Sequence, residues 1–229
     1  MIVWIFREQR SGSTAFTNLI ANRLNRIDKF IGRYPEDIET VKNISNPENY
    51  VFSTHSFEFI EIMNSFDKPV VMIRCVRQDK IERCISYLIA KYKTKRAKHG
   101  DNVWNIVRSS VPSEYKNFAT KIEPMLFTKK EVHNYLRYHT ETNQYWENNT
   151  ALYQNCTVFY EDLCTDAGVD LPILGLTSLS IATDESLTIK LPDYKKQVCL
   201  NYDMVARWIT EYYLENEVCP GGGMVDTQR

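Results

Sequence analysis

Short apolar runs alternate with amphipathic segments along this chain. Residues 2–6 and 70–76 are rich in β-branched and aromatic side chains and show no helical period. A short run that is apolar on both faces predicts a strand covered on both sides, as in a parallel sheet. Helical stripes of apolar residues at three- and four-residue steps follow each of these two runs. The alternation predicts an α/β fold, with a parallel sheet of about four or five strands and helices on both faces.

The remaining elements are predicted from the same two patterns, namely short apolar runs for strands and three- and four-residue apolar steps for helices. Further strands are expected at residues 50–54 and 156–160, and helices at 16–27, 57–66, 81–92, 132–146 and 202–213. Breakers at Gly32, Pro35, Asn46 and Pro47 favour a loop over 28–49, with at most one short helix. No repeat divides the chain. We therefore expect one domain over residues 1–217 and a flexible Gly-rich tail over 218–229.

Charge and composition restrict the partners. The chain has 229 residues and a net charge of −1 at pH 7, so no overall field draws it to nucleic acid or to an anionic membrane. No apolar stretch has the length of a membrane span. The first apolar run ends at Arg7 and Glu8 with no basic region before it, which favours a strand and a cytoplasmic protein over a secretory signal. The six cysteines are irregularly spaced, which favours reduced thiols over zinc ligands.

The loop after the first predicted strand has the composition of an anion site. Arg10 offers a forked cation, Gly12 leaves room for a close backbone approach, and Ser11, Ser13 and Thr14 offer hydroxyl donors. The following helix adds N–H groups at its positive end. The simpler alternative is a turn in which Ser13 or Thr14 caps the helix. The GxxxxGK[ST] pattern of ATP-binding loops is absent.

A second anion anchor is predicted after the strand at 70–76. Arg77 lies at the end of this strand, and Ser86 lies about two turns along the helix that follows. The alternative is an ordinary helix start with surface charges, for which Asp79 is a suitable N-cap.

A histidine ends the strand at 50–54. His55 is expected at the same sheet edge as the Arg10 loop, because the carboxyl ends of parallel strands share one edge. Histidine titrates near neutral pH, so its neutral form can accept a proton from a hydroxyl group. The alternative is a strand-end histidine without a catalytic role.

These segments resemble the sulfotransferases that use 3′-phosphoadenylyl sulfate (PAPS). The sequence QRSGST at residues 9–14 resembles their 5′-phosphosulfate loop, most closely that of the bacterial trehalose-type branch. Arg77-Gln78-Asp79 with Ser86 resembles their 3′-phosphate motif, although Gln78 stands where many relatives have arginine. Arg77 must then hold the phosphate, alone or with Arg74 or Arg83. The segment VFYEDL at residues 158–163 resembles a late, mainly structural family segment.

The resemblance implies a P-loop NTPase-like parallel sheet and a set of roles. Arg10, Ser11, Gly12, Ser13 and Thr14 would hold the 5′ end of the nucleotide, and Arg10 would also offset charge on the leaving phosphate.

For the second end and the chemistry, the resemblance implies that Arg77 and Ser86 hold the 3′-phosphate. His55 is similar to the base of the cytosolic branch. Trehalose-type relatives use a loop glutamate, which Glu36 matches loosely. We expect His55 to be the base and keep Glu36 as the alternative.

The expected activity is transfer of a sulfuryl group to a hydroxyl of a carbohydrate or other small acceptor, with 3′-phosphoadenosine 5′-phosphate (PAP) as the nucleotide product and no metal. Two alternatives stay open: a kinase on a related fold, and a nucleotide-binding module without catalysis. The acceptor and the oligomeric state, including a homo-oligomer, are not predicted.

Overall fold

A five-stranded parallel sheet forms the centre of the molecule. The computed structural model describes residues 1–8, 12–31, 35–55, 60–96, 124–181 and 194–217. Within them the strand order is β2-β3-β1-β4-β5. The strands are β1 (Ile2–Arg7), β2 (Ile27–Ile31), β3 (Tyr50–Thr54), β4 (Val70–Val76) and β5 (Gln154–Phe159). The predicted α/β fold with a parallel sheet is confirmed.

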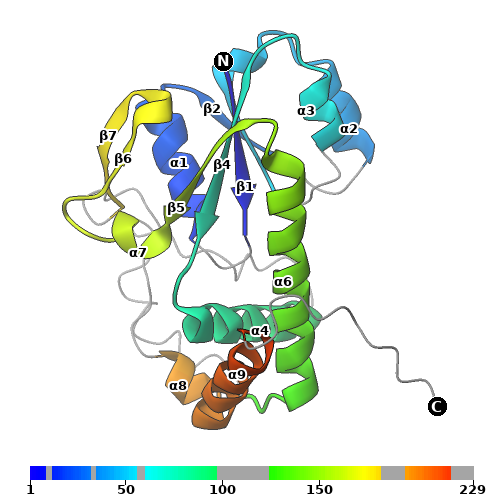
Figure 1. Cartoon of the computed structure of the whole chain (residues 1–229), viewed down its shortest axis with the longest axis vertical. Coiled ribbons are helices and arrows are strands. Elements are labelled where there is room, and N and C mark those ends of the chain that lie inside the picture. The colour runs from blue at the N-terminus through cyan, green and yellow to red at the C-terminus, as the bar shows by residue number, and fades with distance from the viewer. Residues whose placement is uncertain (9–11, 32–34, 56–59, 97–123, 182–193, 218–229) are drawn as a thin grey trace.

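Helices cover both faces of this sheet (Figure 1). One face carries α1, the short α7 and a two-stranded antiparallel sheet of β6 and β7, while α2, α3 and α6 lie on the other. Their bounds are α1 (Ser13–Arg23), α2 (Pro35–Lys42), α3 (Ile60–Asn64), α6 (Lys129–Thr150), α7 (Tyr160–Leu163), β6 (Val169–Leu171) and β7 (Leu176–Leu179). Two 3-10 turns, η1 (Pro47–Asn49) and η4 (Pro172–Leu174), complete these layers.

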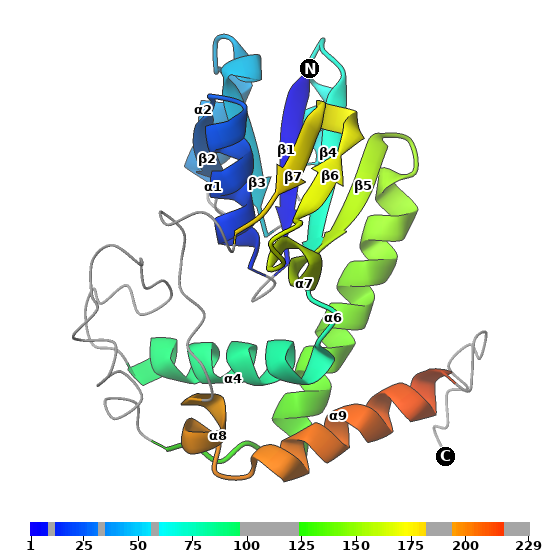
Figure 2. The same ribbon diagram turned by 90° about the vertical axis from the view of Figure 1, so that its left-hand side faces the viewer.

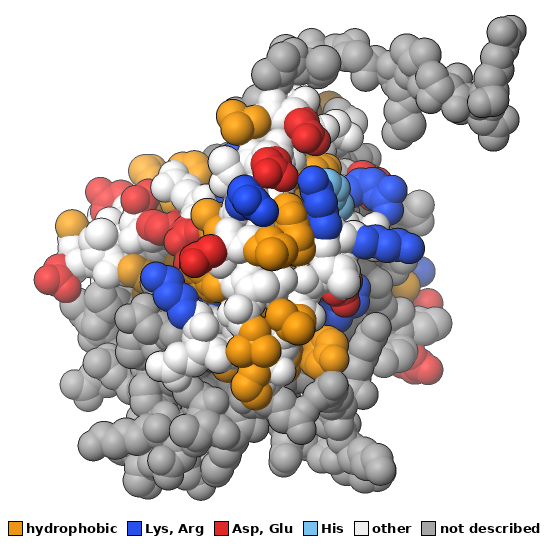
Figure 3. All heavy atoms as spheres, turned by 90° about the horizontal axis from the view of Figure 1, so that it is seen from below, with side chains coloured by type: hydrophobic (Ala, Val, Ile, Leu, Met, Phe, Trp, Pro, Cys, Tyr) orange, Lys and Arg blue, Asp and Glu red, His pale blue; other side chains and the backbone are white. Residues whose placement is uncertain are grey.

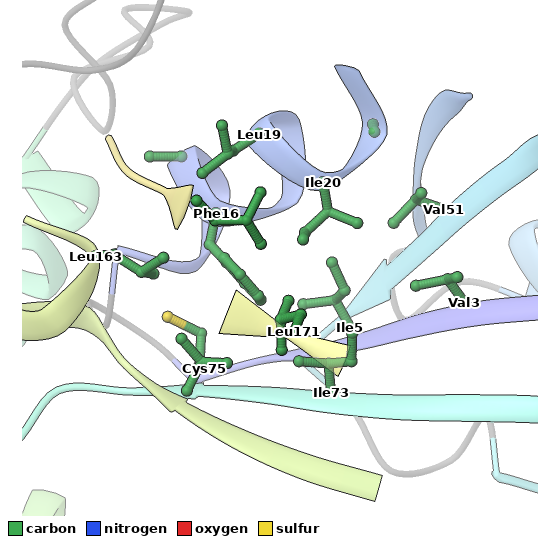
Figure 4. Packing of buried hydrophobic residues seen from close by; sticks show 14 of the residues in the cluster. Val3, Ile5, Phe16, Leu19, Ile20, Val51, Ile73, Cys75, Leu163 and Leu171 are labelled. Carbon is green, nitrogen blue, oxygen red and sulfur yellow. The ribbon is translucent and has the colours of Figure 1, made fainter. Parts of the chain in front are cut away.

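The two-residue period of β1 explains why both faces are buried. Val3 and Ile5 pack toward α1, where Phe16 is fully buried (Figure 4). Trp4 and Phe6 point to the opposite face and join the apolar cluster there. Each such buried side chain stabilises the fold by about 1.5–3 kcal/mol relative to exposure, so β1 is anchored from both sides.

A second group of helices lies below the carboxyl edge of the sheet (Figure 2). It consists of α4 (Lys80–Arg96), α8 (Tyr194–Val198) and α9 (Tyr202–Glu217), and the lower half of α6 packs with them. Its core includes Ile85, Leu136 and Ile209, which are nearly inaccessible to solvent. The carboxyl edge therefore faces a helical layer.

The sequence prediction for residues 27–31 was wrong. Residues 27–31 were expected at the end of a helix and the start of a loop, yet they form β2 at the edge of the sheet. The sequence IDKFI carries two charged residues, and only Ile31 is buried. An edge strand needs only one partner, and β2 pairs with β3 alone, so its pattern lacks the apolar run that identifies a central strand.

The face that carries α8 and α9 has no single dominant charge. Seen from the side of α8 and α9, acidic, basic and apolar side chains are interspersed (Figure 3). Among the described helices, none has the length and apolarity needed to cross a membrane.

Candidate functional site

The candidate site lies at the carboxyl end of β1, between β3 and β4. The chain leaves β1 through α1 on one face of the sheet, and it returns to β5 through α6 on the other. In open α/β sheets, the point where connections part to opposite faces is where ligands bind. Gly12 to Thr14 of the predicted anion loop, the end of β4 and His55 all lie at this edge.

The first predicted loop reaches α1 through a left-handed glycine. Gly12 has φ 76° and occupies the N-cap of α1; Arg10 and Ser11 lie outside the described residues. Because the cap is glycine, no side chain at that position satisfies the first N–H groups of the helix. The Ser13 hydroxyl donates to the carbonyl of Glu8 at 3.2 Å, while the Thr14 hydroxyl accepts a hydrogen bond from the Arg7 guanidinium.

Gly12 also lies directly against an aromatic ring. A Cβ added to Gly12 would be 2.1 Å from two carbons of the Tyr160 ring. Only glycine fits here, because both the positive φ and the ring exclude a side chain. The first residue of α7 is thereby packed onto the start of α1.

Gly12→Ala is therefore expected to lower the free energy of unfolding by about 1–3 kcal/mol from backbone strain, with a further loss from the clash with Tyr160. Gly175→Ala is the matched control, because Gly175 has φ 67° but a Cβ added there would meet nothing within 4 Å. Urea unfolding of both variants separates strain from clash. Equal losses in the two variants would contradict the close contact with Tyr160.

The second predicted anchor meets the same ring. The Arg77 guanidinium lies over Tyr160, with 5.6 Å from Cζ to the ring centroid. Its Nη2 is 3.5 Å from Glu82 and its Nε is 3.9 Å from Glu161. Arg77 is buried, and its Nε has no hydrogen-bond partner within the described structure. Tyr160 thus connects Gly12 of the first motif with Arg77 of the second.

The other residues of the second motif are placed differently. Ser86 is buried within α4, whereas the ion pairs of Arg77 run to Glu82 and Glu161. Gln78 is exposed, and its backbone N–H donates to Glu161. Asp79 caps α4 as the alternative interpretation expected, because its carboxylate accepts from the N–H of Glu82 at 2.8 Å.

A buried carboxylate that the sequence analysis missed organises this edge. Glu8 follows β1 and is only 3% exposed. Arg74 donates to its Oε1 from Nε at 2.6 Å and also from Nη2. Arg83 Nη1 lies 3.3 Å and His139 Nε2 lies 3.2 Å from its Oε2. Arg74 and Arg83, considered as helpers for a phosphate, are therefore bound to Glu8 instead.

The hydrogen bonds of this cluster fix the ionisation of its members. Burial raises the pKa of Glu8, but the hydrogen bond from His139 and the charges of Arg74 and Arg83 outweigh it and lower the pKa below its ordinary value. Arg83 Nη2 and Asn143 Nδ2 both lie 3.3 Å from His139 Nδ1, so this nitrogen accepts and Nε2 carries the proton. Burial also lowers the pKa of His139, which keeps the ring neutral.

Arg7 joins the first loop to His55. Its guanidinium donates to Thr14 and, at 3.4 Å, to Ser53, and it lies 4.8 Å above the Phe30 ring. Its carbonyl oxygen is bound by Nδ1 of His55. Burial lowers the pKa of Arg7, and the nearby Asp28 opposes this shift. The sequence gives only a weak indication that Arg7 links the loop to His55, because a charged residue ends a strand of otherwise buried side chains.

His55 borders a hollow between the sheet edge and α6. The hollow is small, with a volume of about 10 Å³, and it is partly open to solvent. Its lining residues are Phe6, Arg7, Glu8, His55, Tyr135, Tyr138, His139 and Thr142. Because Nδ1 of His55 contacts a carbonyl oxygen, it must carry the proton, and the neutral ring holds its lone pair on Nε2. Glu36 is exposed in the first turn of α2 and is not among the described residues that line the hollow.

Comparisons with known proteins leave the family open. No protein-family model matches the chain, and no curated protein matches it significantly. The described residues hold no group of three or more metal-ligating side chains. The interpretation of the site therefore rests on its own geometry.

Proposed function

We propose that this chain is a sulfotransferase. It moves a sulfuryl group from 3′-phosphoadenylyl sulfate to a hydroxyl of a carbohydrate or other small acceptor by in-line displacement. The observation that carries the proposal is the contact of one ring, Tyr160, with both Gly12 and Arg77. A nucleotide with phosphates at its 5′ and 3′ positions needs two anion anchors close together, and these two motifs meet at one aromatic side chain.

The 5′ end of the nucleotide is assigned to the start of α1. Gly12 leaves the first N–H groups of α1 without a side-chain cap, and helix N-termini of this kind favour phosphate. Thr14 is held in place by Arg7. Arg10 and Ser11 precede Gly12 in the chain and complete the proposed loop, with Arg10 offsetting charge on the leaving phosphate oxygen.

The 3′-phosphate is assigned to Arg77. Its buried Nε without a hydrogen-bond partner in the described structure suits a phosphate oxygen, because arginine binds such oxygens with its fork of N–H groups. The start of α4 supplies the N–H groups of Gln78 and Asp79 at the same place. The assignment of Ser86 to the 3′-phosphate rests only on the sequence resemblance to sulfotransferases.

The reacting hydroxyl of the acceptor is assigned to the small hollow beside His55. The donor supplies the sulfuryl group and leaves as PAP. As the oxygen of the acceptor hydroxyl bonds to sulfur and the bond from sulfur to the bridging phosphate oxygen breaks, the hydroxyl proton passes to Nε2 of His55. The tautomer fixed by the Arg7 carbonyl suits this role, and we assign it to His55 rather than Glu36.

Thermal unfolding with nucleotides tests the proposal. PAP at 100 times its dissociation constant should stabilise the protein by about 2.7 kcal/mol, adenosine 5′-phosphate should act less at equal concentration, and ATP with Mg²⁺ should act least. Arg77→Ala should remove most of the PAP effect, whereas Arg207→Ala, which removes an exposed arginine of α9, should not. No stabilisation by PAP would refute the proposal, and a preference for ATP with Mg²⁺ would favour the kinase.

A further inference from the structure

A carboxylate of the protein already occupies the start of α4. Glu161 Oε2 accepts from the N–H of Gln78 at 3.0 Å, and Oε1 accepts from the N–H of Asp79 at 3.1 Å. The same Oε1 lies 3.9 Å from Nε of Arg77. Two successive N–H groups and an arginine are the donors that a phosphate would use at this position.

The second observation is the state of Arg77. Its side chain is 8% exposed, yet its Nε lacks a hydrogen-bond partner in the described part of the chain, because 3.9 Å from Glu161 is too long. Burying such a donor without a bond is unfavourable. Glu161 therefore offsets the charge of Arg77 without accepting a hydrogen bond from its Nε. A larger tetrahedral anion at this position would reach Nε, which the carboxylate does not.

We infer that Glu161 competes with the 3′-phosphate for Arg77 and for the N–H groups of Gln78 and Asp79, and so sets the affinity for nucleotides that carry this phosphate. This inference rests on the proposed function. Glu161 and a phosphate cannot both use these donors, because two anions at hydrogen-bonding distance from the same groups repel each other strongly. Binding of the phosphate therefore requires the Glu161 side chain to turn away.

The local structure allows this exchange. The Glu161 side chain is 35% exposed, so it can turn into solvent without leaving a buried charge. The neighbouring Tyr160 is packed between Gly12 and Arg77. It keeps α7 in place while Glu161 moves.

Glu161→Gln is the variant that tests the competition, because it removes the charge and preserves the shape. Titration calorimetry should show PAP binding about tenfold tighter than in the wild type, a change of about 1.4 kcal/mol. Binding of adenosine 5′-phosphate, which lacks the 3′-phosphate, should change less than about twofold. Asp162→Asn is the control, since it removes an exposed negative charge one residue away on the same short helix, and it should leave both affinities nearly unchanged.

Four other results would overturn the competition between Glu161 and the 3′-phosphate. If Glu161→Gln and Glu161→Ala both fold with the wild-type melting temperature but bind PAP more weakly, Glu161 prepares Arg77 for the phosphate and the inference is overturned. Unchanged PAP affinity also overturns it and leaves the proposed function intact. If neither the wild type nor the variants bind PAP, the proposed function fails as well. Equal tightening by Asp162→Asn would show a general charge effect and overturn a specific competition.

Discussion

Glu8→Ala should lower the free energy of unfolding by about 3–5 kcal/mol, the loss typical of removing one partner from a buried ion pair. The substitution would leave Arg74 and Arg83 buried without their shared carboxylate. It would also remove the acceptor of the His139 N–H. Because buried charges without partners are far less stable than exposed ones, most of this loss is desolvation rather than lost attraction.

Urea unfolding at neutral pH measures this loss. Glu211→Ala is the control, because Glu211 forms ion pairs with Lys129 and Arg207 on the exposed side of α9. Its loss should be within about 1 kcal/mol, as for surface pairs in general. If the two variants lost similar amounts, Glu8 would not hold the carboxyl edge together as we describe.

His55→Gln is expected to lower kcat by about 10²–10⁴-fold, the usual contribution of a general base. Glutamine preserves an N–H group that can bind the Arg7 carbonyl, but its amide cannot take a proton. The affinity for PAP should stay within about twofold of the wild type, because the proposed nucleotide anchors are at Gly12 and Arg77. The readout is transfer of labelled sulfuryl groups in an acceptor screen, with kcat and KM measured on the best acceptor.

Two further variants define what this result means. His133→Gln is the matched control, since His133 packs against Tyr212 and is not among the residues that line the hollow; its kcat should be close to that of the wild type. Glu36→Gln should also have little effect. Full turnover in His55→Gln together with a large loss in Glu36→Gln would assign the base to Glu36 and contradict the role proposed for His55.

The central strands were predictable because their patterns are local. Residues 70–76 form a strand with the bounds that their apolar run predicts, since a strand buried on both faces leaves little choice of side chain. The edge strand β2 was missed because half-exposed residues carry no such pattern. The pair β6 and β7 was also missed, because each strand is only three or four residues long.

The candidate site was predictable only where its residues follow one another in the chain. Gly12, Ser13 and Thr14 were predicted as candidates from their loop, and His55 and Arg77 from their strand ends. The Glu8 cluster was not, because its partners lie 66, 75 and 131 residues away and no spacing connects them. A signal was present in Arg74, since a charged side chain within a buried strand requires a buried partner. The contact of Tyr160 with Gly12 and Arg77 was missed for the same reason, because these residues lie far apart in the chain.

A crystal structure of the wild-type protein with PAP tests the central claim most directly. We expect the 5′-phosphate at the first N–H groups of α1 beside Gly12, and the 3′-phosphate within hydrogen-bonding distance of Arg77 Nε. Glu161 should then have turned away from Gln78 and Asp79. A nucleotide bound elsewhere, or one whose 3′-phosphate does not touch Arg77, would contradict the proposed function.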